Sequence, residues 1–482
     1  MNRQQPPTPG RPGLTLFAAC LGFVVVILDV SVVNVATKAL AGDFGGSLSG
    51  LEWVINGYTL TFAAFLLTAG AMGDRFDPKH IFIWGFVLFA VTSLACGAAP
   101  SLVALIAARV AQGIGAAMIV PSSLSLVNTN FPDPARRTRA VSLWAAAGGL
   151  ALAVGPVVGG VLVDWLGWRS IFYVNVPIAL AGTVLIRLYA LPAPARDRSV
   201  RRSLDLPGQL LAVVGLGTLT AAIVEANAQG WNSPLVLGCA AVFLISLFTF
   251  IAAERRSSDP MLPLHLFGRK AFSSTSLIGV LLNFAFYGLI FVFSLFFQQV
   301  WSYSPITAGL AFLPMTAAIM AANLSCGPLV KRYGARTVLL TGNTLAAVGY
   351  LATVPVVGSE SYSAMAVQFL VAGFGIGLVV PSMTTAMLNA VDPANAGIAS
   401  GVLNASRQLG GLIGVAVMGL LVGQATSGHF LSGLRAALVA AVVALAVSAV
   451  MSATGIRGAG GPDPSPTAAG RPARAAGTAG TR

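Results

Sequence analysis

The sequence predicts an all-helical integral membrane protein with fourteen transmembrane helices. Of its 482 residues, 56% are hydrophobic and only 9% are charged, whereas about 25% of the residues of a soluble domain are charged. No single soluble core could bury this much apolar surface. Two further observations support the prediction: the basic residues gather in alternate loops, and part of the sequence is repeated.

The apolar segments define the predicted spans, because each is about long enough to cross a bilayer as a helix. With the N-terminus inside, the cytoplasmic segments hold 23 Lys and Arg residues and the outer loops hold three. Basic residues stay in the cytoplasm, so we expect a plasma-membrane protein with both termini cytoplasmic. The spans are 14–36, 54–72, 81–98, 102–128, 139–163, 171–190, 206–225, 234–253, 272–298, 307–330, 336–357, 362–389, 397–424 and 431–456.

An internal repeat divides the chain. The stretch GIGAAMIVPSS at 113–123 matches GFGIGLVVPSM at 373–383. Two like-oriented six-helix bundles around a shared site are typical of a rocking transporter. The predicted order is a cytoplasmic segment 1–13, a bundle 14–190, a linker 191–205, two additional helices 206–253, a linker 254–271, a second bundle 272–456 and a disordered cytoplasmic tail 457–482.

Several classes of protein are excluded by what the chain contains. The net charge of +13 lies in short loops, which indicates membrane topology and no nucleic-acid partner. The four cysteines lie inside apolar segments without metal or redox spacing, so no disulfide, metal or cofactor is expected. A phosphate-binding GxxxxGK[ST] loop and an enzymatic constellation are missing, which argues against an ATP-driven pump or an enzyme.

Span 14–36 carries a lone acid, Asp29, and it is too long and too polar for a signal peptide. A charge at this depth is costly and is a functional hypothesis by default. Span 102–128 carries Arg109. Both residues lie about 10 Å below the outer surface at about 1.5 Å per residue, which predicts an ion pair. The pair either exchanges a proton during transport or is a static contact that orients two helices.

Three other positions suggest moving parts. Gly155, Gly159 and Gly160 allow close helix packing, and Pro156 permits a bend. The alternative is ordinary close packing. Asp74 and Arg75 lie in the cytoplasmic loop between spans 54–72 and 81–98, where Asp74 is expected against a helix N-terminus. A second buried cation, Arg407, lies about 15 Å into the membrane from the inner side.

These motifs resemble those of the major facilitator superfamily, and within it the fourteen-span drug:proton antiporters, such as the actinobacterial antibiotic-resistance exporters of the methylenomycin A resistance type. The resemblance covers about residues 14–456. It rests on LDVSVVNVA at 28–36, LIAARVAQGIG at 105–115, GPVVGG at 155–160 and GAMGDRFDPK at 70–79, where Asp77 and Pro78 depart from the usual pattern. It implies a major facilitator fold, proton coupling by Asp29 and Arg109, and gating by Asp74, Arg75, Gly155, Pro156, Gly159, Gly160 and Arg407.

The expected function is proton-coupled efflux of an antibiotic or another amphipathic small molecule by a monomer in the lipid bilayer. The alternative is a proton-coupled or facilitated transporter of a small metabolite on the same fold. The substrate cavity should combine apolar and uncharged polar groups. The candidates are Asn34, Tyr58, Gln112, Asn283, Tyr287, Gln298, Asn323 and Asn404. Glu225, in one of the two additional helices, is expected to be an interface residue.

Overall fold

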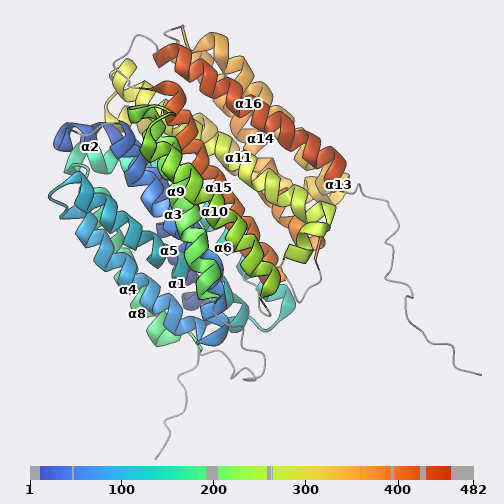
Figure 1. Ribbon diagram of the computed structural model, residues 1–482. Coiled ribbons are helices and arrows are strands. Elements are labelled where there is room, and N and C mark those ends of the chain that lie inside the picture. Colours follow the sequence, from blue (N-terminus) through green and yellow to red (C-terminus); the bar gives the residue numbers. More distant parts are fainter. Residues whose placement is uncertain are drawn as a thin grey trace, which may run out of the picture.

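The computed structural model describes residues 11–45, 48–191, 205–257, 262, 264–359, 361–391, 396–423 and 430–456. These residues form a bundle of long, roughly aligned helices (Figure 1). Eleven helices are long and apolar enough to cross a membrane, and twelve if the two parts of the bent helix α6 form one span. The count of fourteen spans stays a prediction, as do the domain limits.

The described residues of the first part of the chain form eight helices, and local chemistry explains where several of them start. Proline stands at the start of α1, α4 and α6, where its missing N–H costs nothing. Ser101 caps α5 by accepting a hydrogen bond from the backbone N–H of Ala104 at 3.2 Å. The helices are α1 (Pro12–Val35), α2 (Thr37–Phe44), α3 (Leu48–Arg75), α4 (Pro78–Gly97), α5 (Leu102–Asn130), α6 (Pro134–Leu166), α7 (Ser170–Tyr173) and α8 (Asn175–Tyr189).

In the second part, two predicted spans are joined by a single non-helical residue. Helix α13 consists of two helices that meet at Gly334, with φ 81° and ψ 154°, and it begins at Leu313, after the separate short helix α12. Glycine adopts this positive φ without a steric penalty. The helices are α9 (Leu206–Gln229), α10 (Pro234–Arg256), the 3-10 helix η2 (Leu264–Gly268), α11 (Lys270–Leu295), the π-helix η3 (Phe296–Val300), α12 (Pro305–Leu310), α13 (Leu313–Val356), α14 (Tyr362–Asn389), α15 (Ala396–Val422) and α16 (Phe430–Gly455).

The structure differs from the predicted boundaries in several places. Helix α3 continues through Asp74 and Arg75, so both residues belong to its last turn instead of a loop. The predicted span 171–190 is interrupted at Val174, between α7 and α8. The predicted linker 254–271 contains η2. The segments 1–10, 192–204 and 457–482, which were predicted to be cytoplasmic, lie outside the described residues.

The sequence repeat is also a repeat of contacts. A Cβ atom on Gly113 of α5 would overlap the carbonyl oxygen of Tyr58 in α3, and one on Gly373 of α14 would overlap that of Met315 in α13. Two residues further on, Gly115 faces α4 and Gly375 faces the second part of α13 in the same way. Glycine allows backbones to approach this closely, so corresponding glycines bring corresponding helices together.

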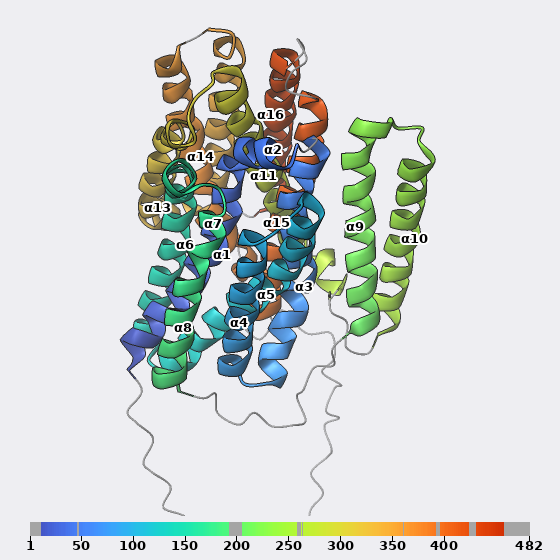
Figure 2. The ribbon, with the colours of Figure 1, turned by 90° about the vertical axis from the view of Figure 1, so that its left-hand side faces the viewer.

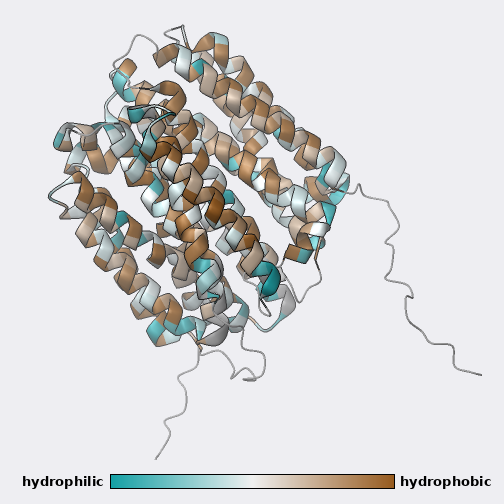
Figure 3. Ribbon diagram, viewed as in Figure 1, coloured by the Kyte–Doolittle hydropathy of each residue, from teal (hydrophilic) through white to brown (hydrophobic). Residues whose placement is uncertain are grey.

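Helices α9 and α10 lie side by side at one edge of the bundle (Figure 2). Helix α9 contacts α3 and α15, so it touches both parts of the chain. The Thr68 hydroxyl donates to Gln209 Oε1, and Gln209 Nε2 donates to the carbonyl oxygen of Ala64 at 2.9 Å. Hydrophobic residues cover much of the visible helix faces (Figure 3). In α10, Phe248 is 68% and Ile245 is 65% exposed, as expected for a surface that faces lipid.

The two parts of the chain meet at the end of the molecule that carries α2, here called the α2 end. Lys38 Nζ donates to the carbonyl oxygen of Gln298 in η3 at 2.8 Å. Ser294 Oγ in α11 donates to the carbonyl oxygen of Asn34 in α1 at 2.6 Å. These hydrogen bonds join the end of α1 and α2 to the end of α11 and η3, so the bundle is closed there.

Candidate functional site

A buried ion pair joins α1 to α5. Arg109 Nη1 donates to Asp29 Oδ2, and the two side chains are 1% and 0% exposed. The other two ion pairs between described residues, Asp77 with His80 and Asp43 with Arg169, are partly exposed. The equal depths of the two residues predict this contact correctly. Because both side chains are buried, solvent screens their attraction much less than that of an exposed pair.

The second carboxylate oxygen of Asp29 is held by two amides. Gln112 Nε2 donates to Asp29 Oδ1 at 3.2 Å and Asn175 Nδ2 donates to it at 2.9 Å. Both amides also donate to Ser93 Oγ, at 2.8 and 3.3 Å respectively. With the guanidinium, three side-chain donors face one carboxylate.

Arg109 also makes other contacts. Its Nε donates to the carbonyl oxygen of Val54 at 3.0 Å, and Nη1 donates to Gln112 Oε1 at 2.7 Å. The guanidinium carbon lies 4.2 Å from the ring centre of Tyr58, a cation–π contact. Tyr58 OH donates in turn to the carbonyl oxygen of Val26 at 3.3 Å. The network therefore ties α1, α3, α4, α5 and α8 together, and a planar fork with several donors suits it better than an ammonium group.

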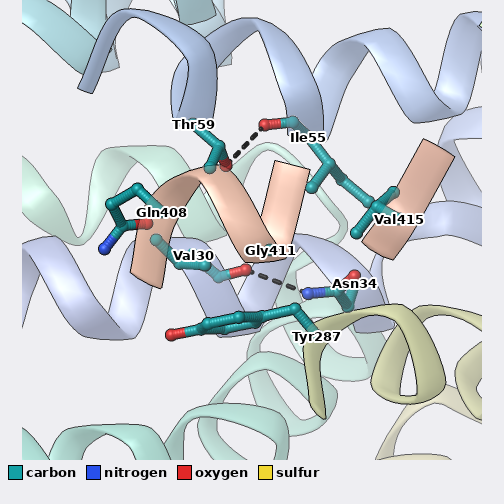
Figure 4. A pocket seen from close by; sticks show the side chains of 8 residues that line it. All are labelled: Val30, Asn34, Ile55, Thr59, Tyr287, Gln408, Gly411 and Val415. Carbon is teal, nitrogen blue, oxygen red and sulfur yellow. Dashed lines mark hydrogen bonds between the residues drawn. The ribbon is translucent and has the colours of Figure 1, made fainter. Parts of the chain in front are cut away.

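A small cavity lies between the two parts of the chain, about 10 Å³ in volume, which is roughly the room that one water molecule needs. Its lining comes from α1, α3, α11 and α15 (Figure 4). Asn34 Nδ2 and Thr59 Oγ1 donate to carbonyl oxygens of their own helices. The lining residues are Val30, Asn34, Ile55, Thr59, Tyr287, Gln408, Gly411 and Val415.

Of the eight predicted cavity residues, Asn34 and Tyr287 line this cavity. Tyr58 and Gln112 belong to the ion-pair network instead. Asn283 and Asn404 each donate to the carbonyl oxygen four residues earlier, at 2.9 and 3.0 Å. Gln298 donates to Ser294 Oγ at 2.9 Å, and Asn323 Nδ2 faces Gly149 of α6. The assignment of all eight residues to a substrate cavity stays a prediction.

The predicted gating residues of α6 pack on two partners. Gly155 and Gly159 face α1, where a Cβ atom on Gly159 would lie 2.9 Å from Val32 Cα. Gly160 faces α12, and its Cβ would lie 2.6 Å from the carbonyl oxygen of Pro305. The carbonyl oxygen of Pro156 lies against Gly309 in the same helix, α12. This face of α6 therefore contacts both parts of the chain near the α2 end.

The remaining predicted gating residues lie far from that contact. Asp74 and Arg75 are in the last turn of α3, and their side chains are outside the described part of the structure. After them, Asp77 caps α4 by accepting from Lys79 N at 2.9 Å. Arg407 of α15 runs beside Gly279 of α11, and its Nε atom has no hydrogen-bond partner among the described residues.

Comparison with known proteins identifies the family. The sequence profile described as "Major Facilitator Superfamily" matches residues 19–415 and 275–479. The chain belongs to the Major Facilitator Superfamily. Its fold agrees with the family: a bacterial homologue of the human lysosomal transporter Spinster, solved in an inward-facing and unoccupied conformation, superposes with a TM-score of 0.65 at 17% identity over 92% of this chain and 96% of that one.

Relatives within the Major Facilitator Superfamily are closer in sequence. A "Methylenomycin A resistance protein" of Streptomyces coelicolor is 38% identical over 85% of this chain and 86% of its own length. A "Tetracenomycin C resistance and export protein" of Streptomyces glaucescens is 32% identical over 86% of this chain and 76% of its own length. The predicted resemblance to antibiotic-resistance exporters of this superfamily is confirmed, and the chain is a multi-pass membrane transporter, not an enzyme.

Sequence reasoning missed two members of the network, Ser93 and Asn175. Ser93 is one small polar residue in an apolar helix, which by itself indicates nothing. Asn175 could have been recognised, because it is the first residue of α8, directly after the break at Val174. An amide at such an end, at the depth of Asp29, was a recognisable candidate partner.

Proposed function

We propose that this protein exports an antibiotic or another amphipathic small molecule in exchange for protons. The observation that carries the proposal is the buried network around Asp29 and Arg109, which lies in a superfamily transporter whose relatives are named for antibiotic resistance and export. Those names favour export over the alternative, uptake of a metabolite. The proposed arrangement is a monomer with fourteen spans, two six-helix bundles and both termini in the cytoplasm.

In the proposed cycle Asp29 alternates between a carboxylate and a carboxylic acid. As a carboxylate it accepts from Arg109, Gln112 and Asn175. A proton that binds to Asp29 removes the charge attraction and turns an acceptor into a donor, which releases Arg109. One proton moving inward supplies about 2.3 kcal/mol per 100 mV and about 1.4 kcal/mol per pH unit. This free energy can drive a substantial concentration gradient of the exported solute.

Gating follows from the contacts between α6 and α12. Gly155 and Gly159 let α6 lie on α1, and Gly160 with Pro156 forms the contact with α12. Because α1 and α6 belong to the same predicted bundle, they move together, and the contact between α6 and α12 separates when the bundles rock. We assign Arg407, Asp74 and Arg75 to the same gating movement, with Arg407 acting at α11 and the other two at the opposite end of the molecule.

Everted membrane vesicles test the coupling. Wild-type protein should accumulate its substrate when the lumen is acidified, and the Asp29→Asn variant should lose this accumulation at least tenfold while inserting normally. The matched control is Asp164→Asn, which changes an exposed acid of α6. The substrate is found first by drug-susceptibility profiling of a pump-deficient host. Proton-driven accumulation that persists in Asp29→Asn rejects the proposed role.

A further inference from the structure

A second buried acid lies at the α2 end, outside the Asp29 network. Glu52, near the start of α3, is 1% exposed, and its Oε1 atom has no hydrogen-bond partner among the described residues. This atom lies against Gly419 of α15, where a Cβ atom would overlap it, and Phe291 of α11 lies beside them. Glu52 therefore sits where α3 meets the other part of the chain.

The polar groups around Glu52 do not compensate a negative charge on it. Asn56, one turn further along α3 and on the same face, is 0% exposed, and neither atom of its amide has a partner in the described part of the chain. From α9, the charge that acts on Glu52 is that of Glu225. Glu225 accepts from Trp53 Nε1 at 3.4 Å and from Gln229 Nε2 at 3.1 Å.

These surroundings favour a neutral Glu52. A charge on a buried carboxylate whose Oε1 atom has no hydrogen-bond partner among the described residues is costly, so the neutral, protonated form is favoured. The negative charge of Glu225 adds like-charge repulsion. The residues that face Glu52 from α15 and α11, Gly419 and Phe291, carry no charge. In the described structure, then, no positive group offsets a charge on Glu52, in contrast to Asp29.

We propose that Glu52 is a second proton-binding site of this transporter, occupied while α3 lies against α15 at the α2 end. The carboxylate takes a proton from water at that end before the contact forms, and one O–H bond is made. When α15 moves away, water reaches the group, the O–H bond breaks and the proton returns to that water. This site is additional to the proposed exchange at Asp29, because its protonation depends on the contact between α3 and α15 and not on the solute that is carried.

Infrared titration of the purified full-length protein in lipid vesicles tests this site. The wild type should show the carbonyl-stretch band of a protonated carboxyl group at neutral pH. The band should be lost in Glu52→Gln but kept in Asp29→Asn and in the exposed control Asp164→Asn. In Glu225→Gln the removal of a neighbouring negative charge should shift the disappearance of the band to lower pH, by about one unit.

The outcomes separate this site from the proposed function. A band that Glu52→Gln leaves unchanged overturns the inference, even if Asp29 proves to be essential for transport. A missing export activity leaves the titration fully interpretable, because no substrate is added. If Glu52→Gln does not fold, the shift in Glu225→Gln decides, and a band that titrates at the wild-type pH in that variant overturns the proposal.

Discussion

At the scale of single residues, the donors around Asp29 and Arg109 explain why these side chain types are needed. Arg109 donates through Nη1 to Asp29 and Gln112, and through Nε to the carbonyl oxygen of Val54. A lysine in its place keeps the positive charge but has one nitrogen at the end of a flexible stem. It cannot reach Val54 and Gln112 together, although it can still pair with Asp29.

We therefore expect Arg109→Lys to insert into the membrane but to be less stable and to transport at least tenfold more slowly. Each buried acceptor that it leaves unpaired costs about 1–3 kcal/mol. Thermal unfolding of the purified variant measures the loss of stability, and transport in everted vesicles measures the loss of rate. Arg136→Lys, an exposed position in the first turn of α6, is the matched control. Equal melting temperatures for wild type and Arg109→Lys would show that the additional hydrogen-bond donors of the guanidinium do not contribute to stability.

The residue scale also shows what the sequence could not reveal. Depth in the two spans was enough to pair Asp29 with Arg109. Polar type, in contrast, did not identify the cavity, because a helix can accept the amide hydrogen bonds of its own asparagines: Asn34, Asn283 and Asn404 all donate to the carbonyl oxygen four residues earlier. The helix alone provides a partner for such an amide donor, so the presence of an asparagine in an apolar span does not locate a binding site.

At the scale of helices, the repeated glycines are the main determinants of packing. Gly113 and Gly373 occupy equivalent places in α5 and α14. Gly113 faces a backbone carbonyl oxygen of α3, and Gly373 faces one in the first part of α13. Backbone atoms cannot move aside as a flexible side chain can. The sequence repeat therefore predicts equivalent helices, and the structure supplies the reason why these two positions are glycine.

Gly113→Ala and Gly373→Ala should destabilise the protein to a similar extent, by about 1–3 kcal/mol each, because overpacking against a rigid neighbour costs this much. The measurement is the melting temperature of each purified variant in the same detergent. Gly238→Ala in α10 is the control, since nothing lies within 4 Å of a Cβ atom there, and alanine is the better helix former. A melting temperature of Gly113→Ala as high as that of Gly238→Ala contradicts the packing argument.

At the scale of the whole molecule, composition and the distribution of basic residues predicted a multi-pass helical transporter, but not its joints. The chain passes from the first to the second part of α13 through Gly334 alone, and one glycine carries no signal that separates a helix break from a packing residue. The interruption at Val174 between α7 and α8 could not be predicted from the sequence either, because valine is common in apolar helices.

A surface contact joins α2 to the link between α6 and α7. Asp43 Oδ2 accepts from Trp168 Nε1 at 2.9 Å and from Arg169 Nη1 at 2.7 Å. The hydrogen bonds from Trp168 and then from Arg169 hold the pKa of Asp43 below its ordinary value. A lowered pKa in the folded state means that the contact stabilises the protein above the unfolded pKa of about 3.9, and that this contribution disappears as the pH falls through the lower, folded value.

The Asp43→Asn variant should accordingly melt slightly below the wild type at pH 7. The two melting curves should converge in acid, once Asp43 of the wild type is protonated. The effect is small because the pair is exposed and screened by solvent. Melting temperatures measured from pH 7 downwards check the prediction. A difference that stays constant down to the most acidic pH at which the protein is folded would assign the effect to the shape of the side chain.

The hydrogen bonds between α3 and α9 restrict how such a protein can change during evolution. Thr68 is 8% exposed and bonded to Gln209, and Gln209 also holds the carbonyl oxygen of Ala64. Removal of residues 206–256 would expose these polar groups of α3 to the hydrocarbon of the membrane, where each polar group without a hydrogen-bond partner costs several kcal/mol. A lineage that gained or lost this hairpin must therefore have exchanged polar and apolar residues on α3 at the same time.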